Sequence, residues 1–115
     1  MRKTKIKGLT EEDQGAVLEF TQALRQIFGK RIKQIKLFGS KARGESEEFS
    51  DIDIFLLIDR LGEQDRKIIG DISFELDLKY DVVLSPIIYS EYEYNDPKYQ
   101  VTPFLQTIRK EGISV

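Results

Sequence analysis

The stretch FGSKARGESEEFSDIDI, residues 38–54, decides the fold and holds the residues best suited to chemistry. It begins at the end of an apolar strand predicted over 33–38, continues through a polar connection, and ends in a second strand predicted over 52–58. Because side chains alternate along a strand, Asp51 and Asp53 should project from the same face. The stretch therefore predicts two neighbouring carboxylates at the start of a buried strand.

Asp51 and Asp53 repel each other unless a cation neutralises them. Mg²⁺ prefers oxygen ligands and is commonly held by one or two carboxylates together with substrate phosphates. Both aspartates are thus candidate metal ligands, and two ions between them would suit phosphoryl or nucleotidyl transfer. The alternative is that an Asp-x-Asp pair at a strand edge is a solvated feature that blunts aggregation.

Gly39 and Ser40 form a candidate phosphate site. Glycine lets the backbone turn sharply and approach a ligand, serine adds a hydroxyl and an amide, and a helix starting there would aim its first amides at phosphate. An ordinary turn is the alternative. Gly39 and Gly44 also have the spacing of a Walker A loop, but Glu45-Ser46 stands where that loop requires Lys followed by Ser or Thr. The Walker A interpretation is therefore excluded.

The combined string resembles the signature of the polymerase-β-like minimal nucleotidyltransferases. Ten residues separate Gly39-Ser40 from Asp51-Ile52-Asp53, with Ala42-Arg43-Gly44 and Ser50 also in place. The resemblance implies an α/β (α+β) fold, in which three helices pack on a small mixed sheet of three to four strands. It also implies one nucleotidyltransferase domain over residues 1–115, of which we expect 1–8 to be a flexible tail.

The resemblance implies a role for each residue of this site. Asp51 and Asp53 would hold two Mg²⁺ ions, while Ser40 and the amides around Gly39 would grip the β- and γ-phosphates of ATP. A third metal-site carboxylate is implied in a segment of the form x-Asp-Val-Val, which here is Asp81. That carboxylate would also help to deprotonate the acceptor hydroxyl.

Other charged residues have weaker claims on the site. Asp77 and Glu75 are rivals of Asp81, but both fall at the end of a predicted helix, which favours solvated side chains. Arg43 matches the Ala-Arg-Gly of the family and would either touch the triphosphate or pin the loop by pairing with a carboxylate. Lys41 is at no fixed position of the signature, and we predict a solvated charge there.

The remaining segments complete the expected order of elements. Thr10 and Asp13 resemble a capping pair for a first helix that ends at Gly29, and a second helix is expected between Gly62 and about Asp77. The apolar stripes that identify these two helices are Val17, Phe20, Leu24, Ile27 and Phe28, and Ile68, Ile69, Ile72 and Leu76.

The last third of the chain is expected to hold a strand, a loop and a helix. A third strand over 80–84 should stop at Ser85-Pro86, with a short strand at 87–89. The acidic, tyrosine-bearing segment 89–99 is predicted to be a surface loop. A last helix should begin after Thr102 and end at Gly112, with Phe104, Leu105 and Ile108 as its apolar face.

Composition excludes several classes of function. The 115 residues include 18 Lys plus Arg and 20 Asp plus Glu, which gives a net charge of −2, and there is no Cys, His or Trp. Thiol nucleophiles, imidazole bases, disulfides and the usual zinc sites are therefore excluded. The near-neutral charge argues against direct DNA binding. With no signal-peptide or membrane-spanning pattern, we expect a cytoplasmic protein.

The short chain leaves little room for an acceptor-binding domain. Among minimal nucleotidyltransferases, a chain of this size resembles the MNT antitoxins found with HEPN-type ribonuclease toxins, which implies transfer of AMP from ATP to a tyrosine of the toxin. The segment 89–99 and the helix 103–112 are candidate partner surfaces, although Tyr89, Phe104 and Ile108 could equally pack internally. The alternatives are a non-catalytic module that neutralises a toxin by binding it, and a nucleotidyltransferase acting on a small molecule.

Overall fold

The computed structural model describes residue 6, residues 8–45 and residues 50–115. Its elements in chain order are α1 (Glu11–Phe28), a 3₁₀ turn η1 (Gly29–Arg31), β1 (Ile32–Phe38), α2 (Gly39–Arg43), β2 (Ile52–Ile58), α3 (Glu63–Tyr80), β3 (Leu84–Ser90), α4 (Glu91–Tyr94), α5 (Pro97–Gln100), α6 (Pro103–Glu111) and β4 (Ile113–Ser114). The expected mixed α/β fold is confirmed.

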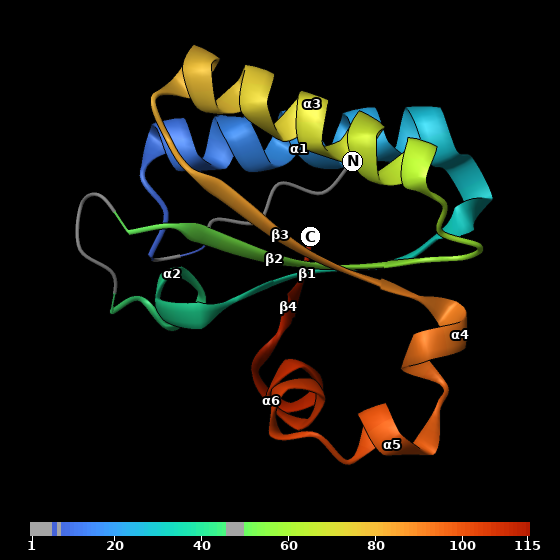
Figure 1. Ribbon diagram of the computed structural model, residues 1–115. Coiled ribbons are helices and arrows are strands. Elements are labelled where there is room, and N and C mark those ends of the chain that lie inside the picture. The colour runs from blue at the N-terminus through green and yellow to red at the C-terminus, as the bar shows by residue number, and fades with distance from the viewer. Residues whose placement is uncertain (1–5, 7, 46–49) are drawn as a thin grey trace.

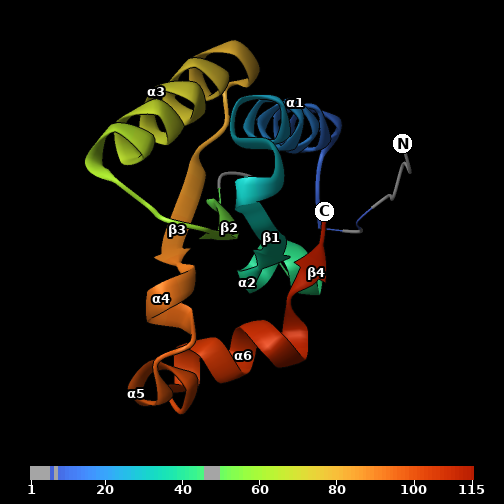
Figure 2. The same ribbon diagram turned by 90° about the vertical axis from the view of Figure 1, so that its right-hand side faces the viewer.

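The four strands form one mixed sheet in the order β3-β2-β1-β4. β2 runs antiparallel to β1 and parallel to β3, and β4 pairs antiparallel with β1. Helices α1 and α3 lie side by side on one face of the sheet, and α4, α5 and α6 lie on the other (Figures 1 and 2). Both faces of the sheet are therefore covered.

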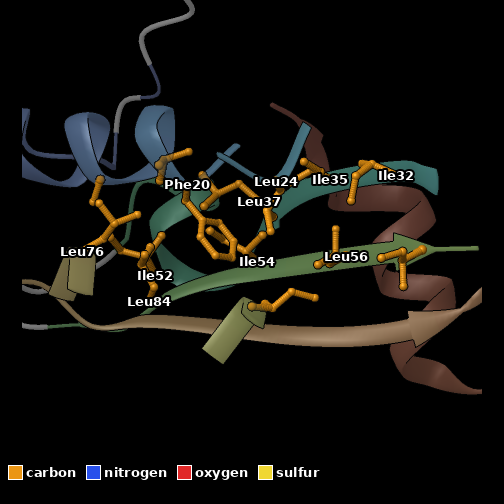
Figure 3. Packing of buried hydrophobic residues seen from close by; sticks show 14 of the residues in the cluster. Phe20, Leu24, Ile32, Ile35, Leu37, Ile52, Ile54, Leu56, Leu76 and Leu84 are labelled. Atoms are coloured by element: carbon orange, nitrogen blue, oxygen red, sulfur yellow. The ribbon is translucent and has the colours of Figure 1, made fainter. Parts of the chain in front are cut away.

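Successive side chains of β2 point to opposite faces of the sheet and belong to two separate hydrophobic clusters. Ile52, Ile54, Leu56 and Ile58 are buried in the larger cluster, together with the stripe of α1 and with Ile69 and Leu76 of α3. Figure 3 shows these side chains filling the layer between the strands and the helices. Phe55 and Leu57 belong to a second cluster with Leu105 and Ile108 of α6. The odd-numbered positions of β2, of which Asp53 is the first, thus face the α6 side.

Helix α1 begins where the capping signal predicts. The Thr10 hydroxyl accepts from the Asp13 amide at 3.0 Å, and Oδ2 of Asp13 accepts from the Thr10 amide at 3.1 Å. Ile27 was expected in the buried stripe, but it is 52% exposed, so this part of the prediction is wrong. The stripe at spacings of three and four ends with Leu24 and Phe28.

The third strand differs most from the prediction. Helix α3 continues to Tyr80, Asp81 ends it in the left-handed conformation (φ 55°), and β3 begins only at Leu84 and runs through Pro86. The strand expected at 80–84 is therefore wrong. A proline is tolerated in β3 because this strand lies at the edge of the sheet, where one side needs no backbone donor.

The segment 89–99 is not a loop. It completes β3 and then forms the short helices α4 and α5. The Tyr89 ring stacks on Phe104 at 6.0 Å between centroids, and Ile108 is buried, so these residues have the packing role. Tyr92 is 87% exposed and remains available on the surface.

The start of the chain is not simply a tail. Ile6 is buried in the larger cluster, although residues 1–8 were expected to be flexible. Gly8 lies so close to Lys41 that a Cβ there would overlap the Lys41 carbonyl group. Residues 1–5 and 7 lie outside the described part. Within the described ranges, no helix combines the length and apolar character needed to cross a membrane.

Candidate active site

The two ends of the signature meet across the β1–β2 hairpin. Phe38, the last residue of β1, pairs with Asp53, so Gly39 begins α2 directly beside that carboxylate. Gly39 has φ +79°, and a Cβ at this position would overlap Oδ2 of Asp53 and lie 3.2 Å from its Cγ. Glycine is required here both by its backbone conformation and by the close approach.

Asp53 is the second residue of β2, and Asp51 directly precedes the strand, near enough for its charge to act on Asp53. Asp51 is exposed and Asp53 is half-buried, whereas Ile52 is fully buried on the opposite face. Burial and then the charge of Asp51 raise the pKa of the Asp53 carboxyl, and Arg43 partly lowers it. The described residues form no ion pair with either carboxylate. The pair therefore carries negative charge that Arg43 offsets only in part.

Asp77 is tied to the sheet instead of being solvated as expected. Its Oδ1 accepts from the Leu84 amide at 2.8 Å, which joins the end of α3 to the start of β3. Burial raises the pKa of the Asp77 carboxyl, the Leu84 amide lowers it, and the charge of Asp51 raises it further. The electrostatic effect of Asp51 thus reaches Asp77 as well as Asp53.

Asp81, the expected third carboxylate, is exposed at the end of α3 and not on a strand. The segment that follows it does lie beside Asp51, because the Ile52 amide donates to the Val83 carbonyl at 2.8 Å. Glu75 is exposed on α3. No three acidic side chains of the described ranges converge as a ready-made metal cluster.

Arg43 pairs with carboxylates at the opening of the site. Its Nε donates to Oε1 of Glu45 at 2.8 Å, and a terminal nitrogen lies 3.7 Å from Oε1 of Glu111 at the end of α6. These contacts agree with the loop-pinning alternative, and contact with a triphosphate stays a prediction. The positive charge of the same guanidinium also partly lowers the pKa of the Asp53 carboxyl. Ser40 lies in the first turn of α2, where its carbonyl accepts from the Glu45 amide at 3.0 Å.

Lys41 is buried, so the prediction of a solvated charge is wrong. Its side chain is 1% exposed, and Nζ lies 2.6 Å from Oδ2 of Asp13, which is itself 6% exposed. The capping pattern identified Asp13 from the sequence as the partner of Thr10. No local pattern indicated that Asp13 also pairs with Lys41, which lies 28 residues away.

A surface hollow of about 530 Å³ lies elsewhere in the fold. It lies at the opposite end of β2 from Asp51 and Asp53, because Asp59 directly follows that strand. Its lining residues are Asp59, Glu91, Tyr92, Asn95, Asp96 and Pro97. None of the predicted site residues belongs to it, so the carboxylates of β2 remain the better candidate site.

The raised pKa of Asp53 predicts a pH-dependent cost to stability. The folded state binds this proton more tightly than the unfolded state does, so the contribution is most favourable below the unfolded pKa of about 4 and is lost as pH rises through the folded pKa. We therefore expect Asp53→Asn to gain stability relative to the unsubstituted protein as pH rises from about 4 to about 7. Urea unfolding without divalent cations measures this, and a pH-independent difference would contradict it.

Known proteins resemble this chain over most of its length, including the segment that carries the candidate site. The nucleotidyltransferase domain family matches residues 17–111. "Putative protein adenylyltransferase MJ0604" of Methanocaldococcus jannaschii is 42% identical over 83 residues, which cover 72% of this chain and 79% of that protein. "Putative protein adenylyltransferase MJ0141" of the same organism is 33% identical over 101 residues, which cover 86% of this chain and 94% of that protein.

Solved structures share the fold. A toxin–antitoxin crystal structure with AMP-PNP has a TM-score of 0.57 and 20% identity, covering 91% of this chain and 72% of that chain. The crystal structure of a "putative nucleotidyltransferase from Sulfolobus solfataricus" has a TM-score of 0.53 and 20% identity, covering 99% of this chain and 89% of that chain. The toxin–antitoxin MntA-HpeT also aligns, with a TM-score of 0.56 and 18% identity over 84% of this chain and 69% of that chain.

Proposed function

Because the chain belongs to the nucleotidyltransferase domain family, we propose that it transfers AMP from ATP to a tyrosine hydroxyl group of a partner protein. The observation that carries this proposal is the approach of Gly39 to the Asp53 carboxylate. It brings a glycine-bearing backbone turn suited to phosphate to the same place as a pair of carboxylates suited to a metal ion.

The side chains present fit a divalent cation. Asp51 and Asp53 offer hard oxygen ligands at the start of β2, and burial together with their mutual repulsion raises the pKa of Asp53. We propose that they hold two Mg²⁺ ions, with Asp81 as the third ligand implied by the family signature. When bound, Mg²⁺ supplies positive charge that neutralises phosphate oxygens and polarises the reacting phosphorus.

The residues of the chain bind and orient the nucleotide in this proposal. The Ser40 hydroxyl and the amides around Gly39 bind the β- and γ-phosphates, and Arg43 contributes positive charge beside them. The acceptor oxygen forms a bond to the α-phosphorus, the bond from that phosphorus to the bridging oxygen breaks, and pyrophosphate leaves. A carboxylate, for which Asp81 is our candidate, accepts the hydroxyl proton.

We propose a toxin protein of the HEPN type as the acceptor and the cytoplasm as the location. The toxin–antitoxin neighbours support this partner class at the level of the fold. The chain has no histidine, on which HEPN nucleases rely, so its role in such a pair is that of the antitoxin. The net charge of −2 does not favour direct DNA binding.

Two labelled forms of ATP test the transfer. The protein is incubated with its toxin partner, Mg²⁺ and ATP labelled either at the α- or at the γ-phosphate. We expect the α-label on a partner tyrosine and no transfer of the γ-label, because pyrophosphate is the leaving group. If the toxin is neutralised without any label, the protein acts as a stoichiometric binding module and the proposal is wrong.

A further inference from the structure

The buried pair Lys41–Asp13 is the feature that the proposed reaction leaves unused. Lys41 is the one fully buried residue of α2, the helix that begins with Gly39 and Ser40. Its ammonium group lies 2.6 Å from Oδ2 of Asp13 in the first turn of α1. Figure 1 shows α2 at the same end of the sheet as the start of α1. The pair therefore connects the glycine turn of the site to the first helix.

The pair contacts α2 through a different residue from the one that meets the carboxylates. Gly39 meets Asp53 at the start of α2, while the Lys41 carbonyl is covered by Gly8 and the Lys41 side chain reaches Asp13. Asp13 is itself fixed, since its Oδ2 also accepts from the Thr10 amide. Ala42 packs against the core, and Arg43 reaches Glu111 at the surface. Of the printed ion pairs of α2, Lys41–Asp13 is the buried one.

An ion pair is a costly way to fill such a position. Two buried charges lose their hydration, and apolar residues of similar volume often stabilise a protein as well or better. An ion pair that also forms a hydrogen bond fixes the relative orientation of the two groups, which apolar contact does not. At 1% and 6% side-chain exposure, Lys41 and Asp13 leave little room for an alternative arrangement.

We propose that Lys41 is a positioning residue, which through Asp13 orients α2 so that Gly39 and Ser40 face Asp53 and the nucleotide phosphates. This inference rests on the proposed function, because the consequence of misplacing α2 is weaker nucleotide binding.

The test compares Lys41→Met with Lys33→Met, which removes an exposed lysine from β1. ATP affinity is measured by calorimetry with Mg²⁺ at a temperature where circular dichroism shows each variant folded. We expect the dissociation constant to rise at least about tenfold in Lys41→Met and to stay unchanged in Lys33→Met. Lys41→Arg, which keeps the charge, should recover most of the affinity.

Asp13→Asn provides a second route to the same result. Its amide oxygen still accepts from the Thr10 amide, but the charge that faces Lys41 is gone. We expect the same loss of affinity as in Lys41→Met and no further loss when both substitutions are combined, because the two side chains act as one unit. If Lys41→Met does not fold, the ATP affinity of Asp13→Asn tests the inference in its place.

Amide hydrogen exchange separates this inference from the proposed function. We expect faster exchange over residues 39–45 in Lys41→Met and Asp13→Asn, and no change in Lys33→Met. If the folded variants bind ATP as the unsubstituted protein does, the pair is only structural and the inference is overturned. If the unsubstituted protein binds no ATP, the proposed function fails, and unchanged exchange over 39–45 would overturn the inference separately.

Discussion

We expect the double variant Asp51→Asn, Asp53→Asn to transfer AMP at least about a thousandfold more slowly than the unsubstituted protein. Asparagine keeps the size of each side chain but removes the negative charge that would hold a cation. Because neither carboxylate belongs to the hydrophobic core, the loss of both removes the proposed metal site and leaves the buried isoleucine face of β2 intact. Initial rates with α-labelled ATP and the toxin partner measure the effect.

The stability of this variant distinguishes a functional site from a structural one. The repulsion between Asp51 and Asp53 and the burial of Asp53 work against folding at neutral pH, as the raised pKa of Asp53 indicates. The double variant should therefore melt at the same or a higher temperature than the unsubstituted protein. Asp71→Asn is the matched control, since Asp71 is exposed on α3 and pairs only with Lys67 among the described contacts. It should transfer AMP at the normal rate.

Gly39→Ala is expected to damage the site through the backbone. A methyl group at φ +79° costs about 1–2 kcal/mol in conformational energy, and here it also overlaps the Asp53 carboxylate. Either α2 or Asp53 must move. Since a displacement of about 1 Å can reduce a rate by about a hundredfold, we expect at least that loss of transfer activity.

Gly70→Ala supplies the control for Gly39→Ala. Gly70 is exposed within α3, and nothing lies within 4 Å of a Cβ built there. Alanine should stabilise the helix by about 0.5–1 kcal/mol, which thermal unfolding detects, and leave transfer unchanged. Equal activity of Gly39→Ala and Gly70→Ala would show that the approach of Gly39 to Asp53 has no functional role.

The hairpin that carries the site was predictable because its signals are local. Alternation predicts that Asp51 and Asp53 share one side of β2, and the turn after β1 is marked by Gly39. The capping pair of α1 is likewise contained in four consecutive residues, from Thr10 to Asp13. Each of these features depends on neighbours in the sequence, and the structure has the cap of α1 and the turn at Gly39.

The features that were missed depend on distant contacts. A strand that includes Pro86 is possible only at a sheet edge, and the sequence does not indicate which strand lies there. The burial of Lys41 requires Asp13, which belongs to another helix. Asp77 was expected to be solvated, but the amide of Leu84 draws its carboxylate toward β3. Charged residues are the hardest to place from sequence because burial depends on whether a partner is found.

The pairing of Phe38 with Asp53 also has a consequence for the order of folding. Gly39, Ser40, Asp51 and Asp53 all belong to the β1–β2 hairpin, whose contacts are close in sequence, whereas β4 must bring Ser114 to Lys36. Local contacts close with a smaller loss of chain entropy and form sooner. We therefore expect the nucleotide-facing hairpin to form early, before the C-terminal strand closes the far side of the sheet.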